Sequence, residues 1–441
     1  MHAMRPSRVP LHTRLAFSAG VLAVILGVGG YALYAHFARA VSYATPQEAS
    51  SVYVRFDMEA YDAIQQNYWN KLSDAQLAEL FTLSADKAAS TTALTKATDR
   101  ATTAKMLAQA FATATSSAAR TNLALNTLAV ALYNLAPPGR DQLFTNQQTT
   151  ALREEVSNVH PSVSLYGDLG IATDSSVAEV NAAAAAKQKE LAASTSPAAA
   201  AALKQVAYAK QVLANPESKS LYDQAGIQPT VFAHVIGHTL YLDLSQIAPT
   251  TLQEFGYAVD QASTTPGLDS LILDLRGNIG GDLAFTQNFL GLFIGNNQYA
   301  FDLYHQGDYE VQRTVQSQFP ELSRYKDIAI LTDGMTQSTA ELTTAAFERY
   351  HLATVVGTTT RGWGTVENTY PLATPLLGKT YTLLLVNSIT LRPDNQPIQG
   401  RGVDPDVDTS KTGWQTMLPS HFRSTSIIAA LKKIATAPPL Q

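Results

Sequence analysis

The residues best suited to chemistry form a serine-centred segment, Ser-Thr-Ala-Glu at 338–341, which follows a short apolar run. A serine hydroxyl becomes an effective nucleophile when a neighbouring base removes its proton. Free main-chain N–H groups at the start of a helix, or in a glycine-rich turn, can hold the oxyanion of a tetrahedral intermediate. We therefore predict Ser338 as a nucleophile. The expected oxyanion donors are Thr339 and the glycine pair Gly280 and Gly281.

The same four residues fit a second interpretation, the capping of a helix. Ser-x-x-Glu ahead of an apolar helix is a capping box, in which Ser338 is the N-cap and Glu341 bonds back to it. A serine at a helix N-terminus can serve both purposes. The segment alone leaves both roles open.

The elements that must position the serine follow an α/β pattern. An apolar strand at 271–275 runs into a glycine-rich turn at 276–281, and a second strand is expected at 328–332. The helix begins at 338, and a third strand follows at 353–357. From about residue 230 onward strands alternate with helices, which indicates βαβ crossovers and a mixed, mainly parallel sheet.

In this order, three motifs resemble those of the tail-specific, or C-terminal processing, serine proteases. They are Asp-Leu-Arg-Gly-Asn-x-Gly-Gly at 274–281, Ser-x-x-Glu at 338–341 and Gly-Val-x-Pro-Asp at 402–406. The resemblance covers about residues 232–410. It implies an α/β protease core and a serine-type peptidase that acts on protein tails or unstructured peptides. It implies no cofactor.

The general base of that family is missing from its expected place. The resemblance implies a lysine in a Gly-Lys-Gly-x-Val-Gln motif, and the matching text at 362–367 is Gly-Trp-Gly-Thr-Val-Glu. Trp363 thus replaces the lysine and Glu367 replaces the glutamine. Tryptophan offers only an N–H donor, and Arg361 stays charged at any usable pH. The alternative function is therefore a catalytically silent pseudoprotease that binds peptides or partners.

No other residue supplies the base from sequence alone. A related branch takes a histidine from a segment that 134–141 matches best here, and this segment has none. His234 and His238 could share a face but lack a third ligand, so we predict packing roles and no metal site. Lys379 is expected in a solvated hairpin, and His351 as a cation at a helix C-terminus.

The N-terminal residues suggest a membrane anchor. Residues 15–38 carry no Asp, Glu, Lys or Arg. At about 1.5 Å per residue, such a run can span a hydrocarbon core of roughly 30 Å. Residues 1–14 contain three arginines, which predicts a cytoplasmic N-terminus, a single-pass signal anchor and an extracytoplasmic bulk. A cleaved signal peptide ending at the small residues of 38–40 is the alternative.

Between the anchor and the core, two regions are expected to be helical. Residues 46–157 resemble the helical region that precedes the core in this family. Residues 163–226 resemble a J domain without its His-Pro-Asp signature, in the place where a PDZ domain is usual. The alternative is an ordinary alanine-rich helical hairpin. A C-terminal tail with a short helix is expected over 411–441.

Composition limits the remaining possibilities. The chain has 36 acidic and 31 basic residues, for a net charge of −5, so no nucleic-acid partner is expected. It contains no cysteine, which excludes disulfides, cysteine metal sites and a thiol nucleophile. The expected partners are unstructured or C-terminal protein segments, and the membrane through the N-terminal helix.

Overall fold

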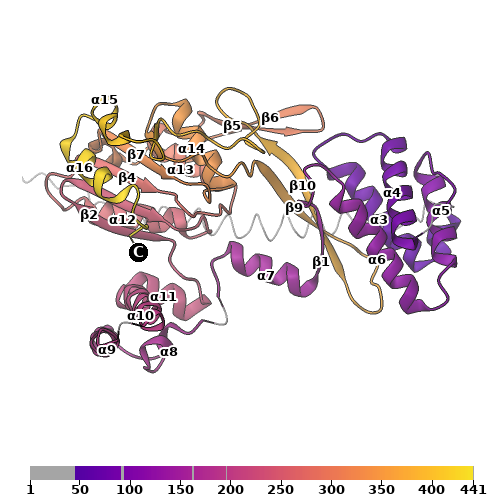
Figure 1. The fold of residues 1–441 in the computed structure, drawn as a ribbon, viewed down its shortest axis with the longest axis horizontal. Helices are drawn as coiled ribbons and strands as arrows, with labels where there is room; N and C mark the ends of the chain where they lie inside the picture. Colours follow the sequence, from indigo (N-terminus) through magenta and orange to yellow (C-terminus); the bar gives the residue numbers. More distant parts are fainter. Residues whose placement is uncertain (1–44, 91–93, 161–162, 195, 441) are drawn as a thin grey trace, which may run out of the picture. The chain divides into compact units, whose positions relative to one another are not determined.

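The computed structural model describes residues 45–90, 94–160, 163–194 and 196–440 (Figure 1). The expected cytoplasmic segment and signal anchor, 1–14 and 15–38, lie outside these ranges. Within them, no helix is long and apolar enough to cross a membrane. The chain forms two compact units that interleave along the sequence. The N-terminal unit comprises 1–150, 301–312 and 364–399, and the core unit comprises 151–300, 313–363 and 400–441.

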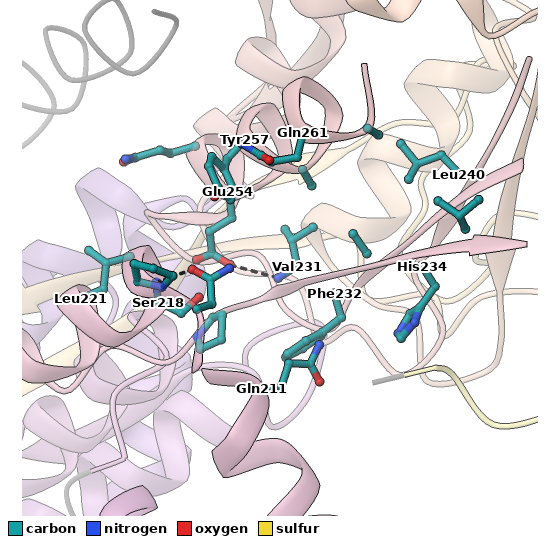
Figure 2. Close-up of a pocket in the computed structure, with 18 of the residues that line it drawn as sticks. Gln211, Ser218, Leu221, Val231, Phe232, His234, Leu240, Glu254, Tyr257 and Gln261 are labelled. Carbon is teal, nitrogen blue, oxygen red and sulfur yellow. Dashed lines mark hydrogen bonds between the residues drawn. The ribbon is translucent and has the colours of Figure 1, made fainter. Parts of the chain in front are cut away.

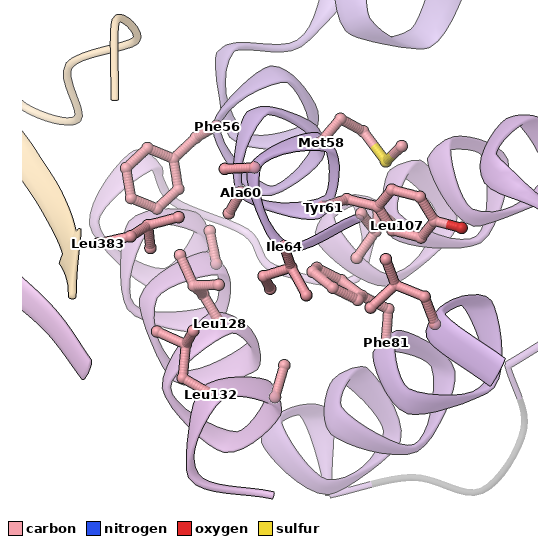
Figure 3. Close-up of a cluster of buried hydrophobic side chains, with 14 of the residues drawn as sticks. Phe56, Met58, Ala60, Tyr61, Ile64, Phe81, Leu107, Leu128, Leu132 and Leu383 are labelled. Carbon is pink, nitrogen blue, oxygen red and sulfur yellow. The ribbon is translucent and has the colours of Figure 1, made fainter. Parts of the chain in front are cut away.

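Helices of the N-terminal unit confirm the expected helical region. They are α2 (Pro46–Ser50), α3 (Val52–Asn67), α4 (Asp74–Ala89), α5 (Arg100–Ala112) and α6 (Ser117–Tyr133). Side-chain oxygens cap their first turns, as Ser73 does for α4 and Asp99 for α5. Their apolar faces meet around Phe56, Tyr61 and Phe81, which are fully or almost fully buried (Figure 3).

A long strand organises the sheet that completes the N-terminal unit. This strand, β10 (Tyr381–Thr390), pairs antiparallel with β1 (Gln142–Thr145), β9 (Thr365–Pro371) and β5 (Tyr299–His305). β6 (Asp308–Arg313) follows β5 at the end of the strand order. Helix α7 (Asn146–Val156) continues directly from β1.

The core unit contains a six-stranded sheet in the order β11-β8-β7-β4-β3-β2. All its neighbours are parallel except the β2–β3 hairpin, which confirms a mixed α/β core. The strands are β2 (Val231–Ile236), β3 (Thr239–Leu244), β4 (Ser270–Asp274), β7 (Asp327–Thr332), β8 (Thr354–Gly357) and β11 (Val407–Asp408).

Helices pack on this sheet through apolar side chains. α12 (Thr251–Ala262), α13 (Ala284–Ile294) and α14 (Thr339–Arg349) share a row of phenylalanines, in which Phe289 lies 4.7 Å from Phe255 and 5.4 Å from Phe347 between ring centroids. α16 (Thr425–Ile434) packs with Ile272 and Leu331 of the central strands. The short η1 (Pro320–Arg324), η2 (Trp414–Thr416) and α15 (Leu418–His421) complete the unit.

Residues 163–226 form a small helical module within the core unit. It contains α8 (Leu165–Leu169), α9 (Val177–Leu191), α10 (Pro197–Ala214) and α11 (Pro216–Ala225). α9 and α10 form a hairpin around a separate buried cluster that includes Leu165, Val180 and Leu213. Both of our interpretations contain such a hairpin, so the likeness to a J domain stays a prediction.

The end of β4 is tied to the C-terminal segment by a buried ion pair. Arg276 donates to the Asp274 carboxylate, and both side chains are almost fully buried. Its Nη1 also donates to main-chain oxygens of the C-terminal segment, those of Ile434, Ala435 and Ala437. The arginine of the Asp-Leu-Arg-Gly motif therefore holds the fold together beneath the glycine turn.

Candidate active site

The serine and the glycine turn meet at the carboxyl edge of the core sheet. β4 and β7 are adjacent parallel strands, so the segments that leave them emerge at the same edge. After β7, the Asp333 carboxylate accepts hydrogen bonds from the N–H groups of Gly277 and Thr336, both at 3.0 Å. The N–H of Gln337 donates to the main-chain oxygen of Asn278 at 2.9 Å. These bonds fix the loop that carries Ser338 against the glycine turn.

Ser338 itself has an unusual backbone conformation, with φ 56° and ψ −127°. Residues with a side chain rarely adopt positive φ, and such strain is concentrated at functional sites. The Glu341 carboxylate accepts from the Ser338 N–H at 2.9 Å, whereas the Ser338 hydroxyl makes no capping hydrogen bond. The two interpretations of the segment therefore divide between two residues: Glu341 caps the helix, and the serine hydroxyl is left for another purpose.

The glycine turn packs against the serine without room for side chains. A Cβ atom on Gly280 would lie 2.7 Å from the Ser338 Cβ and 2.9 Å from the Thr339 nitrogen. A Cβ on Gly281 would lie 1.7 Å from the Ile247 oxygen. Only glycine fits at either position, and both have positive φ.

The three expected oxyanion donors differ in their hydrogen bonds. The Gly280 N–H donates to Asn278 Oδ1 at 2.8 Å, and the Gly281 oxygen accepts from the Thr339 hydroxyl at 3.0 Å. The Thr339 N–H, at the first position of α14, makes no hydrogen bond within the residues that the structure describes. Thr339 is therefore the expected donor that is ready to bind an oxyanion, while Gly280 shares its N–H with Asn278.

Glu341 joins the serine to the position where the lysine is missing. Its Oε2 accepts from the N–H groups of Ser338 and Trp363, at 2.9 and 2.7 Å. Its Oε1 accepts from the Gly362 N–H and the Thr360 hydroxyl, at 2.6 and 2.5 Å. Burial raises the pKa of this fully buried carboxyl, while the four donors act to lower it. The sequence showed Glu341 only as a cap and gave no sign of this second contact.

Comparisons with known proteins fit this geometry. Residues 238–409 match the model of peptidase family S41. A probable CtpA-like serine protease of Staphylococcus epidermidis is 30% identical over 181 residues, which cover 41% of this chain and 35% of that protein. A protein of the same name from Staphylococcus aureus is 32% identical over 151 residues, 34% of this chain and 29% of its own. Residues 238–409 belong to peptidase family S41. The resemblance to tail-specific serine proteases is thereby confirmed.

Two solved structures are also similar to this chain. The photosystem II D1 C-terminal processing protease aligns with a TM-score of 0.49 at 14% identity, over 83% of this chain and 93% of that one. A lipoprotein from Streptococcus agalactiae aligns with a TM-score of 0.43 at 14% identity, over 87% of this chain and 100% of its own. The chain spans about a third of the length of the curated relatives that it matches.

Trp363 stands where the resemblance implies a lysine, and its main-chain N–H donates to Glu341. The indole is half-buried, and the Arg361 guanidinium lies over it, 5.7 Å from the ring centroid. A cation over the face of an indole is an attractive arrangement, and neither group accepts a proton at neutral pH. The position expected for the general base is therefore occupied by Trp363 with Arg361 over its ring, and neither side chain can remove the proton of the serine hydroxyl.

The three histidines considered from sequence lie away from the carboxyl edge. His238 directly precedes β3, at the amino edge of the parallel strands, and its Nδ1 lies 2.8 Å from the Gly267 oxygen. His234 lies within β2 with its ring 6.1 Å from that of Tyr241. His351 follows α14 and precedes β8, also at the amino edge. No group of three or more His, Cys, Asp or Glu side chains is placed to hold a metal ion in the described part of the chain.

The remaining sequence candidates belong to the N-terminal unit. Glu367, on β9, accepts from the Thr365 hydroxyl at 2.5 Å, and Lys379 is exposed in a tight turn. Asp141, in the segment compared with the histidine-bearing one, accepts from the Val386 N–H at 2.7 Å. Burial, reinforced by the charge of Glu367, raises the pKa of Asp141 to about 7. Asp141 is thus a perturbed acid that sequence reasoning noted only as the end of a motif.

Proposed function

We propose that this chain is a membrane-anchored, extracytoplasmic serine-type peptidase that acts on protein tails or unstructured peptides through Ser338. The observation that carries the proposal is the strained backbone of Ser338, which leaves the hydroxyl outside the helix cap. The match of residues 238–409 to peptidase family S41 and the relatives named as CtpA-like serine proteases support the reaction class. The choice of substrate rests on the resemblance of the three sequence motifs to those of tail-specific proteases. The anchor rests on the uncharged run at 15–38.

The described residues account for most steps of such a reaction. A substrate carbonyl would approach the Ser338 hydroxyl beside the Thr339 N–H, which makes no hydrogen bond within the described residues. The Ser338 oxygen would attack the carbonyl carbon, and the Thr339 N–H would donate to the resulting oxyanion. The serine proton needs an acceptor, which Trp363 is not. Enzymes that lose the base keep about 10³–10⁴-fold acceleration over water, so we expect slow turnover.

The second candidate function is a catalytically silent protein that binds peptides in the same groove. It is favoured by the pairing of Arg361 with Trp363 at the lysine position. Under this proposal the oxyanion turn and the helix N-terminus serve to bind a carbonyl, and no bond is broken.

Labelling with a fluorophosphonate separates the two candidates. Wild-type protein is expected to label, and Ser338→Ala is expected to lose the label. Ser323→Ala, on an exposed residue of η1, is the matched control and should label as wild type does. Equal labelling of Ser338→Ala would overturn the choice of nucleophile. An unlabelled wild type that still binds unstructured peptides would support the silent protein instead.

Replacement of Trp363 tests whether the lysine position remains competent. Trp363→Lys introduces an amine where Glu341 already holds the main chain, and we expect it to raise peptide hydrolysis by at least tenfold. Trp363→Met removes the indole without adding a base and is the control. Equal hydrolysis by both variants would show that the backbone no longer aims this position at Ser338.

A further inference from the structure

A cavity of about 760 Å³ lies in the core unit, between the helical module and β2, and Ser338 is not among its lining residues. Figure 2 shows residues of its lining. One wall is β2 with α12, and the opposite wall is the end of α10 with α11. The ring centroids of Tyr208 on α10 and Phe232 on β2 lie 5.9 Å apart, which joins the two walls. The volume falls within the usual range of about 300–1,000 Å³ for ligand sites.

The cavity runs along the free edge of a strand. β2 is the last strand of the core sheet and pairs with β3 alone among the described strands. The Val231 N–H points away from β3 and donates to Glu254 at 3.0 Å. Because edge-facing amides alternate in an antiparallel pair, Ala233 and Val235 present their N–H and C=O groups in the same direction. Both side chains are exposed and line the cavity.

Among the lining residues that the structure describes, Glu254 is the one carboxylate and none is a lysine or arginine. The Oε2 of Glu254 accepts from the N–H groups of Thr230 and Val231 at 2.6 and 3.0 Å. Its Oε1 makes no hydrogen bond within the described chain. Burial raises the pKa of Glu254, and its neighbours Thr250, Thr230 and Val231 offset part of that rise. The other described lining residues are apolar or carry hydroxyl and amide groups, apart from His234, so no lysine or arginine among them faces the Glu254 carboxyl group.

We propose that this cavity is a docking site for an extended peptide segment of a protein partner or substrate. The segment adds as a further strand to the edge of β2 and places one basic side chain against Glu254. Main-chain bonds to Ala233 and Val235 provide affinity, as in other cases of strand addition, and the carboxylate selects the basic residue. Leu221 and Tyr257 contact the remaining side chains from the two walls. The site does not depend on the chemistry of Ser338.

Fluorescence anisotropy with labelled peptides tests the proposal on the full chain. The probe is an eight-residue peptide of alternating Thr and Val with one central lysine, compared with the same peptide carrying norleucine. We expect the lysine peptide to bind about tenfold more tightly, the effect of one charge-assisted hydrogen bond. Glu254→Gln, which keeps an acceptor for Thr230 and Val231, should abolish this difference. Asp260→Asn, on an exposed residue of the same helix outside the lining, should preserve it.

N-methylation of the peptide tests strand addition without altering the protein. Alternate amides of an added strand face the edge of β2, and the amides between them face away from it. Methylation of the set that faces β2 should abolish binding, and methylation of the other set should leave binding unchanged. Equal binding of the lysine and norleucine peptides, or equal tolerance of both methylated sets, would overturn the proposal even if Glu254→Gln failed to fold. Ser338→Ala should bind the probe as wild type does, so loss of catalysis and loss of docking are separately visible.

Discussion

Replacement of Gly280 by alanine tests how closely the oxyanion turn is fitted to the serine. Gly280 has φ +85°, and an added Cβ would lie 2.7 Å from the Ser338 Cβ and 2.9 Å from both the Gln337 oxygen and the Thr339 nitrogen. Two of these three neighbours are main-chain atoms, so the loop itself must move. Gly277, in the same turn, also has positive φ, at +73°, but an added Cβ there would meet nothing within 4 Å.

The difference between these two glycines sets the expected magnitude. Positive φ costs an alanine about 1–2 kcal/mol at either position. The close contacts at Gly280 add about 1–3 kcal/mol, the usual cost of inserting a methyl group into a packed site. We therefore expect Gly280→Ala to lower the free energy of unfolding by about 2–5 kcal/mol. Gly277→Ala should lower it by about 1–2 kcal/mol.

The assay combines urea unfolding, followed by circular dichroism, with fluorophosphonate labelling of the folded proteins. Gly280→Ala should lose most of the label, because the displaced loop carries Ser338 and Thr339, whereas Gly277→Ala should keep it. Equal unfolding free energies and equal labelling in the two variants would refute the close fit of Gly280 to the serine.

Two further predictions concern buried charges. Asp141 has a pKa of about 7 in the folded protein and 3.8 in the reference state, so folding favours its protonated form. Its contribution to the free energy of unfolding is therefore fully present below about pH 4 and is lost as the pH rises through 7. Asp141→Asn keeps an acceptor for the Val386 N–H but cannot ionise, so it should remove the fall in unfolding free energy between pH 4 and 8, which is at most about 4 kcal/mol in the wild type. Urea unfolding across this pH range measures the fall, and an Asp141→Asn profile equal to that of the wild type would contradict the prediction. Arg276→Ala leaves the Asp274 carboxylate buried and unpaired and should cost about 3–5 kcal/mol in the same assay. Lys96→Ala breaks an exposed pair with Glu79 and should cost at most about 1 kcal/mol; equal losses would refute the argument.

The sequence predicted the core sheet well because its strands are defined locally. The runs at 271–273 and 328–331 are continuously apolar and are soon followed by turn residues, as expected for strands buried on both faces. The start of the Ser338 helix was equally visible, because a capping signature is contained within four residues. Each of these features is decided by neighbours in the chain.

Long-range partners could not be predicted in this way. The Val386 N–H bonds to Asp141 across 245 positions, and nothing in either segment names the other. Such pairings assign β9 and β10 to the N-terminal unit, although the sequence resemblance runs without interruption through 232–410. The hydrogen bond from the Trp363 N–H to Glu341 spans 22 positions, and it too joins segments whose sequences do not indicate that they meet. The Ser-x-x-Glu pattern explains Glu341 as a helix cap alone, so it gives no sign of this contact.

The contacts of Arg276 also bear on when the core can fold during synthesis. Its guanidinium is buried against the oxygens of Ile434 and Ala435, and the first of these is made 158 residues after it. Until the ribosome has added that stretch, the Asp274–Arg276 pair lacks its main-chain acceptors and stays open to water. The turn beneath Ser338 therefore gains these main-chain contacts only after residues 434–437 have been added, whatever the order in which the rest of the core folds.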